Sequence, residues 1–175
     1  MKALFLDRDG VLNKHLEGDY VLTPDQLEVL PGVPRAIARL SSLFDKIFVA
    51  TNQQCIGKGL LTHEGLAAIH DKLLAAVEAE GGRIDKIYYC PDLREEHSLH
   101  RKPNVGMALQ ARHEYPGLQL KESVMVGDSM TDLLFGRRCG MTTVLVGNHP
   151  EIATEYPHLT DYCYPTLADY ADSLA

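Results

Sequence analysis

The chain has 175 residues, of which 45% are hydrophobic, and it carries a formal net charge of −7. This much apolar material supports one hydrophobic core without disulfides or a structural metal, so we expect a single domain spanning residues 1–175. The acidic balance, without a run of Lys or Arg, argues against a protein that binds nucleic acid or a membrane surface.

The expected location is the cytoplasm. No apolar stretch approaches the ~18 residues of a membrane span, and the chain enters a strand at once without the layout of a signal peptide. The cysteines are far apart and form no CxxC pair, so we expect reduced thiols. They are Cys55, Cys90, Cys139 and Cys163.

Strand and helix patterns alternate along the chain. Strands are predicted at residues 2–6, 46–50, 84–89, 123–126 and 142–146, with a weak one at 161–164. Helices are predicted at about 33–43, from 62 onward, at 105–115 and 131–139, and from 167. This order predicts an α/β fold, a doubly wound, mostly parallel sheet with helices on both faces. Ligands of such sheets bind at the carboxyl ends of the strands.

Two acidic residues directly follow the first predicted strand. Asp7 and Asp9 flank Arg8, and Gly10 then lets the backbone turn at a positive φ that other residues resist. Two carboxylates this close repel each other, so the pair calls for a counter-cation. Mg²⁺ suits oxygen ligands beside a phosphate, whereas the alternative interpretation is a solvated turn without a metal.

Groups that suit phosphate follow later strands. Thr51, Asn52 and Gln53 end the second strand with a hydroxyl, amides and backbone N–H groups, and Lys102 provides a point positive charge. Each residue alone has an ordinary structural explanation, such as a helix cap or a surface charge.

The fourth strand ends in another acid, Asp128, with Asp132 one turn later. Together with the first acid pair, Thr51 and Lys102, these residues place acids, a hydroxyl and an amine at the strand ends of one sheet. That combination indicates a site for a metal and a phosphate group.

These residues form ordered motifs that resemble those of the haloacid dehalogenase-like phosphatase superfamily, over most of the chain. The motifs are Asp7-x-Asp9, Thr51, Lys102 and Gly127-Asp128-x-x-x-Asp132. The strings DRDGVLN (7–13), TNQQCIGKG (51–59), RKP (101–103) and VGD (126–128) are similar to the branch that contains heptose bisphosphate phosphatases and histidinol-phosphate phosphatases. The resemblance implies a Rossmann-like phosphomonoester hydrolase.

The resemblance also implies catalytic roles. Asp7 attacks phosphorus and carries the phosphoryl group as an aspartyl-phosphate. Asp9 protonates the leaving oxygen and then deprotonates the attacking water, while Thr51 and Lys102 hold phosphate oxygens. A carboxylate nucleophile with an adjacent proton-handling group agrees with what two-step phosphoryl transfer needs.

The metal ligands follow from the same resemblance. The Asp7 side chain, the Asp9 backbone carbonyl and Asp128 are expected to hold Mg²⁺, with Asp132 supporting the site. Ser129 follows Asp128 where close relatives often place Lys, and this removes a positive charge near the metal.

Substrate contacts are expected from Asn52, Gln53 and Arg101, the last as a partner for a second anionic or hydroxyl-rich group. The alternative interpretation of Arg101 is an ordinary surface side chain. Residues 13–31 and 56–90 are too short for a lid domain, so we expect a capless, open site and a monomeric enzyme. The strings DRDGVLN and TNQQCIGKG resemble the heptose subgroup most, which implies that the substrate is a small phosphorylated metabolite, a heptose 1,7-bisphosphate cleaved at its 7-position. Histidinol phosphate is the alternative.

A zinc loop is common in the heptose branch, with Cys-x-His followed by Cys-x-Cys. Here only Cys90 matches, because Asp92 stands at the His position and the later cysteines are missing. Cys90, His97 and His100 offer three ligands, short of the four of a structural site, so we expect a loop without zinc.

Two other classes of protein share part of this pattern. A signalling receiver domain is also phosphorylated on Asp, but its phosphorylated Asp follows a later strand, so the order of motifs excludes it. A catalytically silent phosphate-binding module on the same scaffold stays an alternative, although every expected catalytic position is filled.

Overall fold

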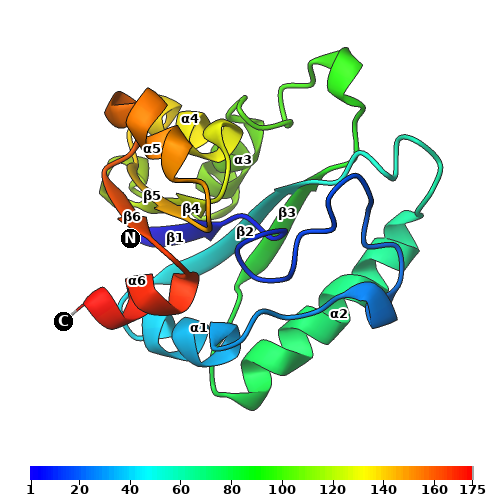
Figure 1. The fold of residues 1–175 in the computed structure, drawn as a ribbon, viewed down its shortest axis with the longest axis horizontal. Coiled ribbons are helices and arrows are strands. Elements are labelled where there is room, and N and C mark those ends of the chain that lie inside the picture. Colours follow the sequence, from blue (N-terminus) through cyan, green and yellow to red (C-terminus); the bar gives the residue numbers. More distant parts are fainter. Residues whose placement is uncertain (175) are drawn as a thin grey trace.

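The computed structural model describes residues 1–174 and shows an α/β fold built around one sheet (Figure 1). The strands are β1 (Ala3–Leu6), β2 (Lys46–Asn52), β3 (Lys86–Cys90), β4 (Val124–Gly127), β5 (Thr142–Val146) and β6 (Tyr162–Tyr164). The helices are α1 (Val33–Ser41), α2 (His63–Ala79), α3 (Gly106–Glu114), α4 (Met130–Arg138), α5 (Pro150–Glu155) and α6 (Leu167–Ser173). No helix among residues 1–174 has the length and apolar character needed to cross a membrane.

The sheet is parallel, with the strand order β3-β2-β1-β4-β5-β6. Leu6 of β1 pairs with Val49 of β2 on one side and with Val126 of β4 on the other. The strand order therefore reverses between β1 and β4, and their carboxyl ends flank the crevice in which folds of this kind bind ligands. The predicted doubly wound parallel sheet is confirmed.

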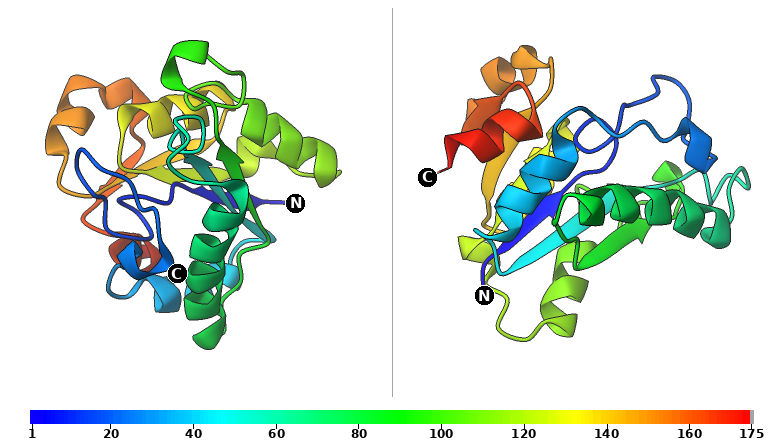
Figure 2. Two further views of the ribbon diagram at one scale, coloured as in Figure 1. Left: turned by 90° about the vertical axis from the view of Figure 1, so that its right-hand side faces the viewer. Right: turned by 90° about the horizontal axis from the view of Figure 1, so that it is seen from below.

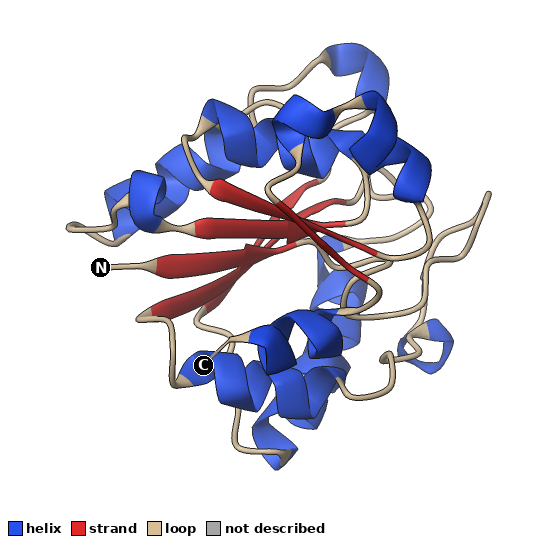
Figure 3. Ribbon diagram, turned by 60° about the vertical axis from the view of Figure 1, so that its left-hand side comes forward, coloured by secondary structure: helices blue, strands red, loops and turns tan. Residues whose placement is uncertain are grey.

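Helices cover both faces of the sheet (Figure 3). Successive strand residues point to opposite faces, so Leu4 and Leu6 pack with α1, α2 and α6, whereas Ala3 and Phe5 pack with α3 and α4. The view from below in Figure 2 shows α6, α1 and α2 along one face. Because both faces are buried, β1 is apolar at every position.

The predicted elements agree with the observed ones apart from their ends and one helix. β2 continues past its predicted end to Asn52, and α4 begins at Met130 because the Ser129 hydroxyl caps it. The weak strand is confirmed as β6. The prediction missed α5, a six-residue helix whose Ile152 packs beside Leu133 and Leu145.

Two connections near the carboxyl ends of the strands shape the surroundings of the crevice. We call residues 14–30, between β1 and α1, the flap; a 3₁₀ turn, Pro24–Gln26, is its helical part. Lys72 of α2 donates hydrogen bonds from Nζ to the carbonyls of Pro24 (2.8 Å) and Leu27 (2.9 Å), which anchors the flap to α2. Neither the flap nor residues 53–62, between β2 and α2, contains a separate lid domain.

Candidate active site

The acid pair lies at the carboxyl end of β1, in the crevice beside β4. The Asp7 N–H donates to the carbonyl of Val126 (3.0 Å), which ties the first acid to β4. Gly10 then adopts a φ of +89°, and a Cβ on it would lie 1.9 Å from Asp128 Oδ2. A residue with a side chain would therefore be strained in the turn and collide with the acid after β4.

Lys102 is the cation at the centre of the site. Its Nζ donates to Asp7 Oδ1 (2.8 Å) and to Asp132 Oδ1 (2.6 Å), and its side chain is only 2% exposed. Asn52 holds the backbone of Lys102 from both sides. The Asn52 Nδ2 donates to the Lys102 carbonyl (3.1 Å), and the Lys102 N–H donates to Asn52 Oδ1 (3.0 Å).

Asp132 fixes the loop after β4. Its Oδ2 accepts hydrogen bonds from the N–H groups of Asp128 (3.1 Å) and Ser129 (3.3 Å) and from the Ser129 hydroxyl (2.9 Å). With Lys102 on its other oxygen, Asp132 is fully engaged. Asp7 and Asp128 are left to face the crevice.

Three carboxylates converge here around one ammonium group. Asp7, Asp128 and Asp132 each offer an oxygen, and these oxygens lie within 4.8 Å of one another. Burial, reinforced by the charge of Asp132, raises the pKa of Asp7 well above its usual value and that of Asp128 to about 7. The unbalanced negative charge and the all-oxygen donor set are what a hard divalent cation such as Mg²⁺ requires.

The second acid of the pair is held in a different environment. Asp9 Oδ1 accepts hydrogen bonds from Arg8 Nη2 and Asn13 Nδ2, both at 2.9 Å, and Asp9 Oδ2 accepts one from Gln53 Nε2 at 3.0 Å. Burial raises the pKa of Asp9, but the Arg8 charge and these hydrogen bonds outweigh it, so the net shift is downward. Asp9 is thus oriented and ionised at neutral pH.

Arg8 owes its position to a buried histidine on α2. The Arg8 side chain is 1% exposed, and its Nη1 lies 3.2 Å from His70 Nε2. Burial and the Arg8 charge lower the pKa of His70 to about 4, so the neutral ring accepts this hydrogen bond. Arg8, Asn13 and His70 were not among the predicted site residues. The first two lie within DRDGVLN, whereas His70 has no signal beyond its place on the apolar face of α2.

A cavity of about 770 Å³ joins most of the predicted site residues. It is lined by Asp7, Asp9, Thr51, Asn52, Lys102, Asp128 and Asp132. Gln53 does not line it. It is buried beneath, where Nε2 also donates to Thr51 Oγ1 (2.9 Å), so it orients Asp9 and Thr51.

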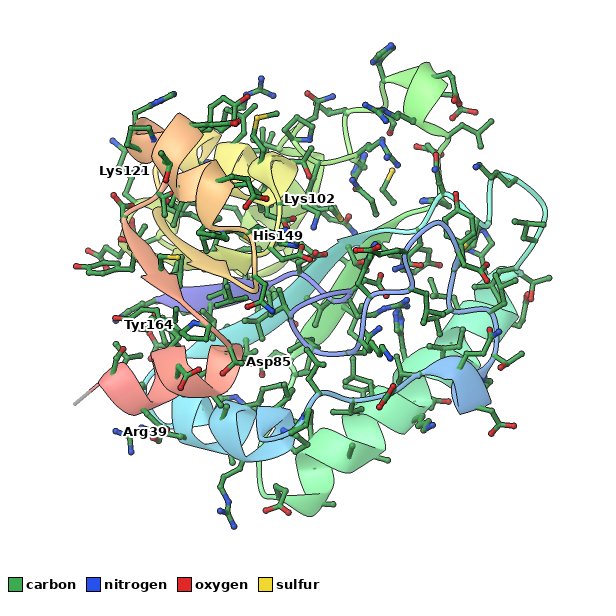
Figure 4. All side chains as sticks on the ribbon, viewed as in Figure 1. Arg39, Asp85, Lys102, Lys121, His149 and Tyr164 are labelled. Carbon is green, nitrogen blue, oxygen red and sulfur yellow. The ribbon has the colours of Figure 1, made fainter. Side chains whose placement is uncertain are left out.

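The rim of this cavity comes from segments that the motifs do not include. Lys14, His15 and Glu17 of the flap line one side, and Asn148 and His149, between β5 and α5, line another. Figure 4 labels Lys102 and His149, which lie in the same region beside α4 and α5. A polar turn after the fifth predicted strand was the available signal for His149.

Arg101 lines a second cavity, of about 410 Å³, together with Arg94 and His97. The two cavities share Asn52, Lys102 and Thr131 in their walls. Within residues 1–174, the buried Arg101 Nη1 has no hydrogen-bond partner. This part of the site is therefore rich in positive charge.

The loop expected to lack zinc has its own arrangement of side chains. Cys90 Sγ lies 3.7 Å from Asp92 Oδ2 and 3.9 Å from Ser98 Oγ. Among residues 1–174, the group of side chains placed to hold a metal is the aspartate cluster, and Cys90, His97 and His100 do not form another. That this loop holds no zinc stays a prediction.

Comparison with known proteins agrees with this geometry. A family model described as HAD-hydrolase-like matches residues 99–170. The D-glycero-alpha-D-manno-heptose-1,7-bisphosphate 7-phosphatase of Mycobacterium bovis is 40% identical over 131 residues, which is 75% of this chain and 69% of that protein. The corresponding beta-heptose enzyme of Bordetella bronchiseptica is 38% identical over 146 residues, covering 83% and 80%.

The same fold is found among solved structures. The D,D-heptose 1,7-bisphosphate phosphatase of B. bronchiseptica, complexed with magnesium and phosphate, superposes with a TM-score of 0.89 at 35% identity, over 99% of this chain and 97% of that one. The enzyme from Burkholderia thailandensis gives a TM-score of 0.72 at 30% identity, over 99% and 97%. The chain therefore belongs to the haloacid dehalogenase-like hydrolase family and is a phosphatase.

Proposed function

We propose that the enzyme hydrolyses the 7-phosphate of D-glycero-D-manno-heptose 1,7-bisphosphate through an aspartyl-phosphate on Asp7. The observation that carries the chemistry is the Asp7 carboxylate, which faces a cavity between Lys102 and Asp128. The names of the M. bovis and B. bronchiseptica relatives support the substrate.

Each of these residues has a separate role in the proposed reaction. Lys102 Nζ and Thr51 Oγ1 bind phosphoryl oxygens and reduce the repulsion that the Asp7 carboxylate meets on approach. An Asp7 oxygen forms a bond to phosphorus as the bond to the sugar oxygen breaks, and Asp9 gives that oxygen a proton. Water then attacks the phosphorus of the aspartyl-phosphate, Asp9 takes its proton, and phosphate leaves with Asp7 restored.

Asp9 must be protonated for the first step and ionised for the second. Arg8 and the amides of Asn13 and Gln53 favour the ionised form. An incoming phosphate dianion raises the pKa of a neighbouring carboxyl, because it disfavours a further negative charge. Substrate binding therefore promotes protonation of Asp9, and transfer of that proton to the departing sugar oxygen leaves Asp9 ionised for the second step.

The Asp7 side chain, the Asp9 carbonyl and Asp128 would hold Mg²⁺, with Asp132 placing the Asp128 loop. Bound there, the ion would neutralise charge on the transferred phosphoryl group. The support is the crowding of carboxylates in this chain and the magnesium in the B. bronchiseptica structure.

Binding of Mg²⁺ is expected to stabilise the protein more at pH 7.5 than at pH 5. Because the pKa of Asp7 and Asp128 is raised, the folded state holds these protons more tightly than the unfolded state does. In the absence of metal, the contribution of Asp128 to the free energy of unfolding therefore falls as pH rises from 3.8 to about 7, and the contribution of Asp7 also falls with rising pH. At 100 times its Kd, Mg²⁺ should raise Tm by about 5–10 °C at pH 7.5.

The measurement is thermal unfolding in EDTA and in Mg²⁺ at both pH values. Asp128→Asn should remove most of the Mg²⁺ effect at pH 7.5. An equal rise in Tm at pH 5 and 7.5 would contradict the role given to these carboxyls.

A second anionic group on the substrate suits the neighbouring cavity. Arg94 and Arg101 offer it two guanidinium groups, and the buried Arg101 Nη1 has no hydrogen-bond partner in the described part of the chain, residues 1–174. The other phosphate of a sugar bisphosphate would satisfy that nitrogen by a charge-assisted hydrogen bond. Histidinol phosphate has an ammonium group and an imidazole ring but no second anionic group for these arginines to bind, so the bisphosphate is favoured.

The test is a comparison of kcat/KM for both anomers of the heptose bisphosphate and for histidinol phosphate, since the relatives' names divide between the anomers. We expect the better anomer to exceed histidinol phosphate by about 100-fold or more. Arg101→Ala should lower kcat/KM for the bisphosphate about 10- to 100-fold and leave kcat/KM for p-nitrophenyl phosphate unchanged. A higher kcat/KM for histidinol phosphate than for either heptose bisphosphate would overturn the proposed substrate. Absence of any Mg²⁺-dependent hydrolysis would instead favour a silent phosphate-binding module.

We also propose that the enzyme is a cytoplasmic, single-domain monomer that acts on this small metabolite. The free thiols Cys55, Cys90, Cys139 and Cys163 support a reducing compartment. The cavity already contains a nucleophile, an acid/base group and phosphate ligands from one chain. Light scattering during size-exclusion chromatography measures the oligomeric state, and a monomer is expected.

A further inference from the structure

One glutamine joins three loops that surround the active site. Gln54, two residues after the end of β2, donates from Nε2 to the hydroxyl of Tyr20 in the flap (3.0 Å). Its Oε1 accepts from the backbone N–H of Arg94, in the loop between β3 and α3 (3.2 Å). Both ends of one half-buried amide are therefore used, each by a different loop.

Other contacts run along the same junction. Lys58 Nζ lies 5.3 Å from the centre of the Tyr20 ring, a cation–π contact. The N–H of Gly57 donates to the carbonyl of Pro91 (3.0 Å), and a Cβ on Gly57 would lie 2.7 Å from that oxygen. The loop after β2 thus holds the flap on one side and the start of the Arg94 loop on the other.

The two loops that Gln54 connects contribute residues to the walls of the two cavities. The flap provides Lys14, His15 and Glu17 to the larger cavity, and the other loop provides Arg94 and His97 to the smaller one. Gln54 itself lines neither cavity, so any effect on substrate must act through these neighbours.

We propose that Gln54 is a positioning residue that sets the affinity for the part of the substrate beyond the transferred phosphoryl group. The proposal rests on the proposed function in naming that part as the far end of a sugar bisphosphate. Loops ordered before binding cost the complex less conformational entropy, so the amide strengthens binding without taking part in phosphoryl transfer. Asp7, Asp9 and Lys102, which carry the chemistry, have no hydrogen bond to Gln54.

The kinetic test uses Gln54→Ala with two substrates. For the heptose bisphosphate we expect KM to rise about fivefold, with kcat within about twofold of the wild type. For p-nitrophenyl phosphate, which does not extend to the loops, both constants should stay unchanged. Gln110→Ala is the matched control, because that side chain donates to Glu114 on α3 (2.8 Å) away from both cavities, and it should alter neither substrate.

Amide hydrogen exchange provides a measurement that needs no substrate. Gln54→Ala should speed exchange in residues 14–30 and in residues 91–101, whereas Tyr20→Phe should speed it in the flap alone. A wild-type enzyme that hydrolyses p-nitrophenyl phosphate but not the heptose bisphosphate would refute the proposed substrate, and exchange would still report on the junction. Unchanged exchange in both loops, or an equal loss of kcat on both substrates, would overturn the role of Gln54.

Discussion

Asp7→Asn is expected to lower kcat by about 10⁴-fold or more on every phosphorylated substrate. Asparagine keeps the size of the side chain but has no anionic oxygen to attack phosphorus. The carboxylates beside it have other partners: Asp132 accepts from Lys102 and from three donors of the loop after β4, and Asp9 accepts from Arg8, Asn13 and Gln53. Asp128 is the proposed metal ligand. The measurement is steady-state hydrolysis with saturating Mg²⁺.

The same substitution should leave the metal-free protein at least as stable as the wild type. Asp7 is buried beside other carboxylates, and its raised pKa shows that its charged form is disfavoured there. Thermal unfolding in EDTA measures this. Asp172→Asn, on the exposed part of α6, is the matched control and should retain full activity. Residual hydrolysis by Asp7→Asn above about 1% of the wild type would show that another group attacks phosphorus.

The sheet and the order of its catalytic residues could be predicted because both depend on local patterns. Strands buried on both faces are apolar throughout, as β1 is, and parallel strands present their carboxyl ends at one edge. Asp7 and Asp128 directly follow two such strands, and Thr51 lies at the carboxyl end of a third, so the three residues had to lie near one another. Gly10 was predictable for the same reason, since only its backbone suits the turn beside Asp128.

What could not be predicted depends on where side chains point and on contacts distant in sequence. Gln53 follows two residues that line the cavity, yet it turns inward to Asp9 and Thr51. The pairing of Arg8 with His70 joins positions that no periodicity connects. Helix α5 is too short to show a helical repeat of apolar residues. Its stability comes from tertiary packing, in which Ile152 contacts the cluster that contains Leu133 and Leu145.

Among the substitutions proposed here, Lys102→Met is expected to cause the largest loss of stability, together with a large loss of activity. It removes the ammonium group from between Asp7 and Asp132 and leaves two buried carboxylates without a counter-charge. Breaking a buried ion pair in this way costs about 3–5 kcal/mol, because the charge that remains is not solvated. Urea unfolding in EDTA measures the free energy of unfolding, and hydrolysis with Mg²⁺ measures the activity.

Adding Asp132→Asn to Lys102→Met separates the two roles of the lysine. The asparagine oxygen can still accept from the Asp128 and Ser129 N–H groups, while its amide faces Asp7 where the ammonium group was. One uncompensated charge is then gone, so we expect the double variant to regain most of the lost stability. It should regain no activity, because the phosphoryl oxygens still lack their cation. Recovery of hydrolysis in the double variant would mean that Lys102 serves only to stabilise the fold. If Lys102→Met alone were as stable as the wild type, the carboxylates would be neutralised by other means.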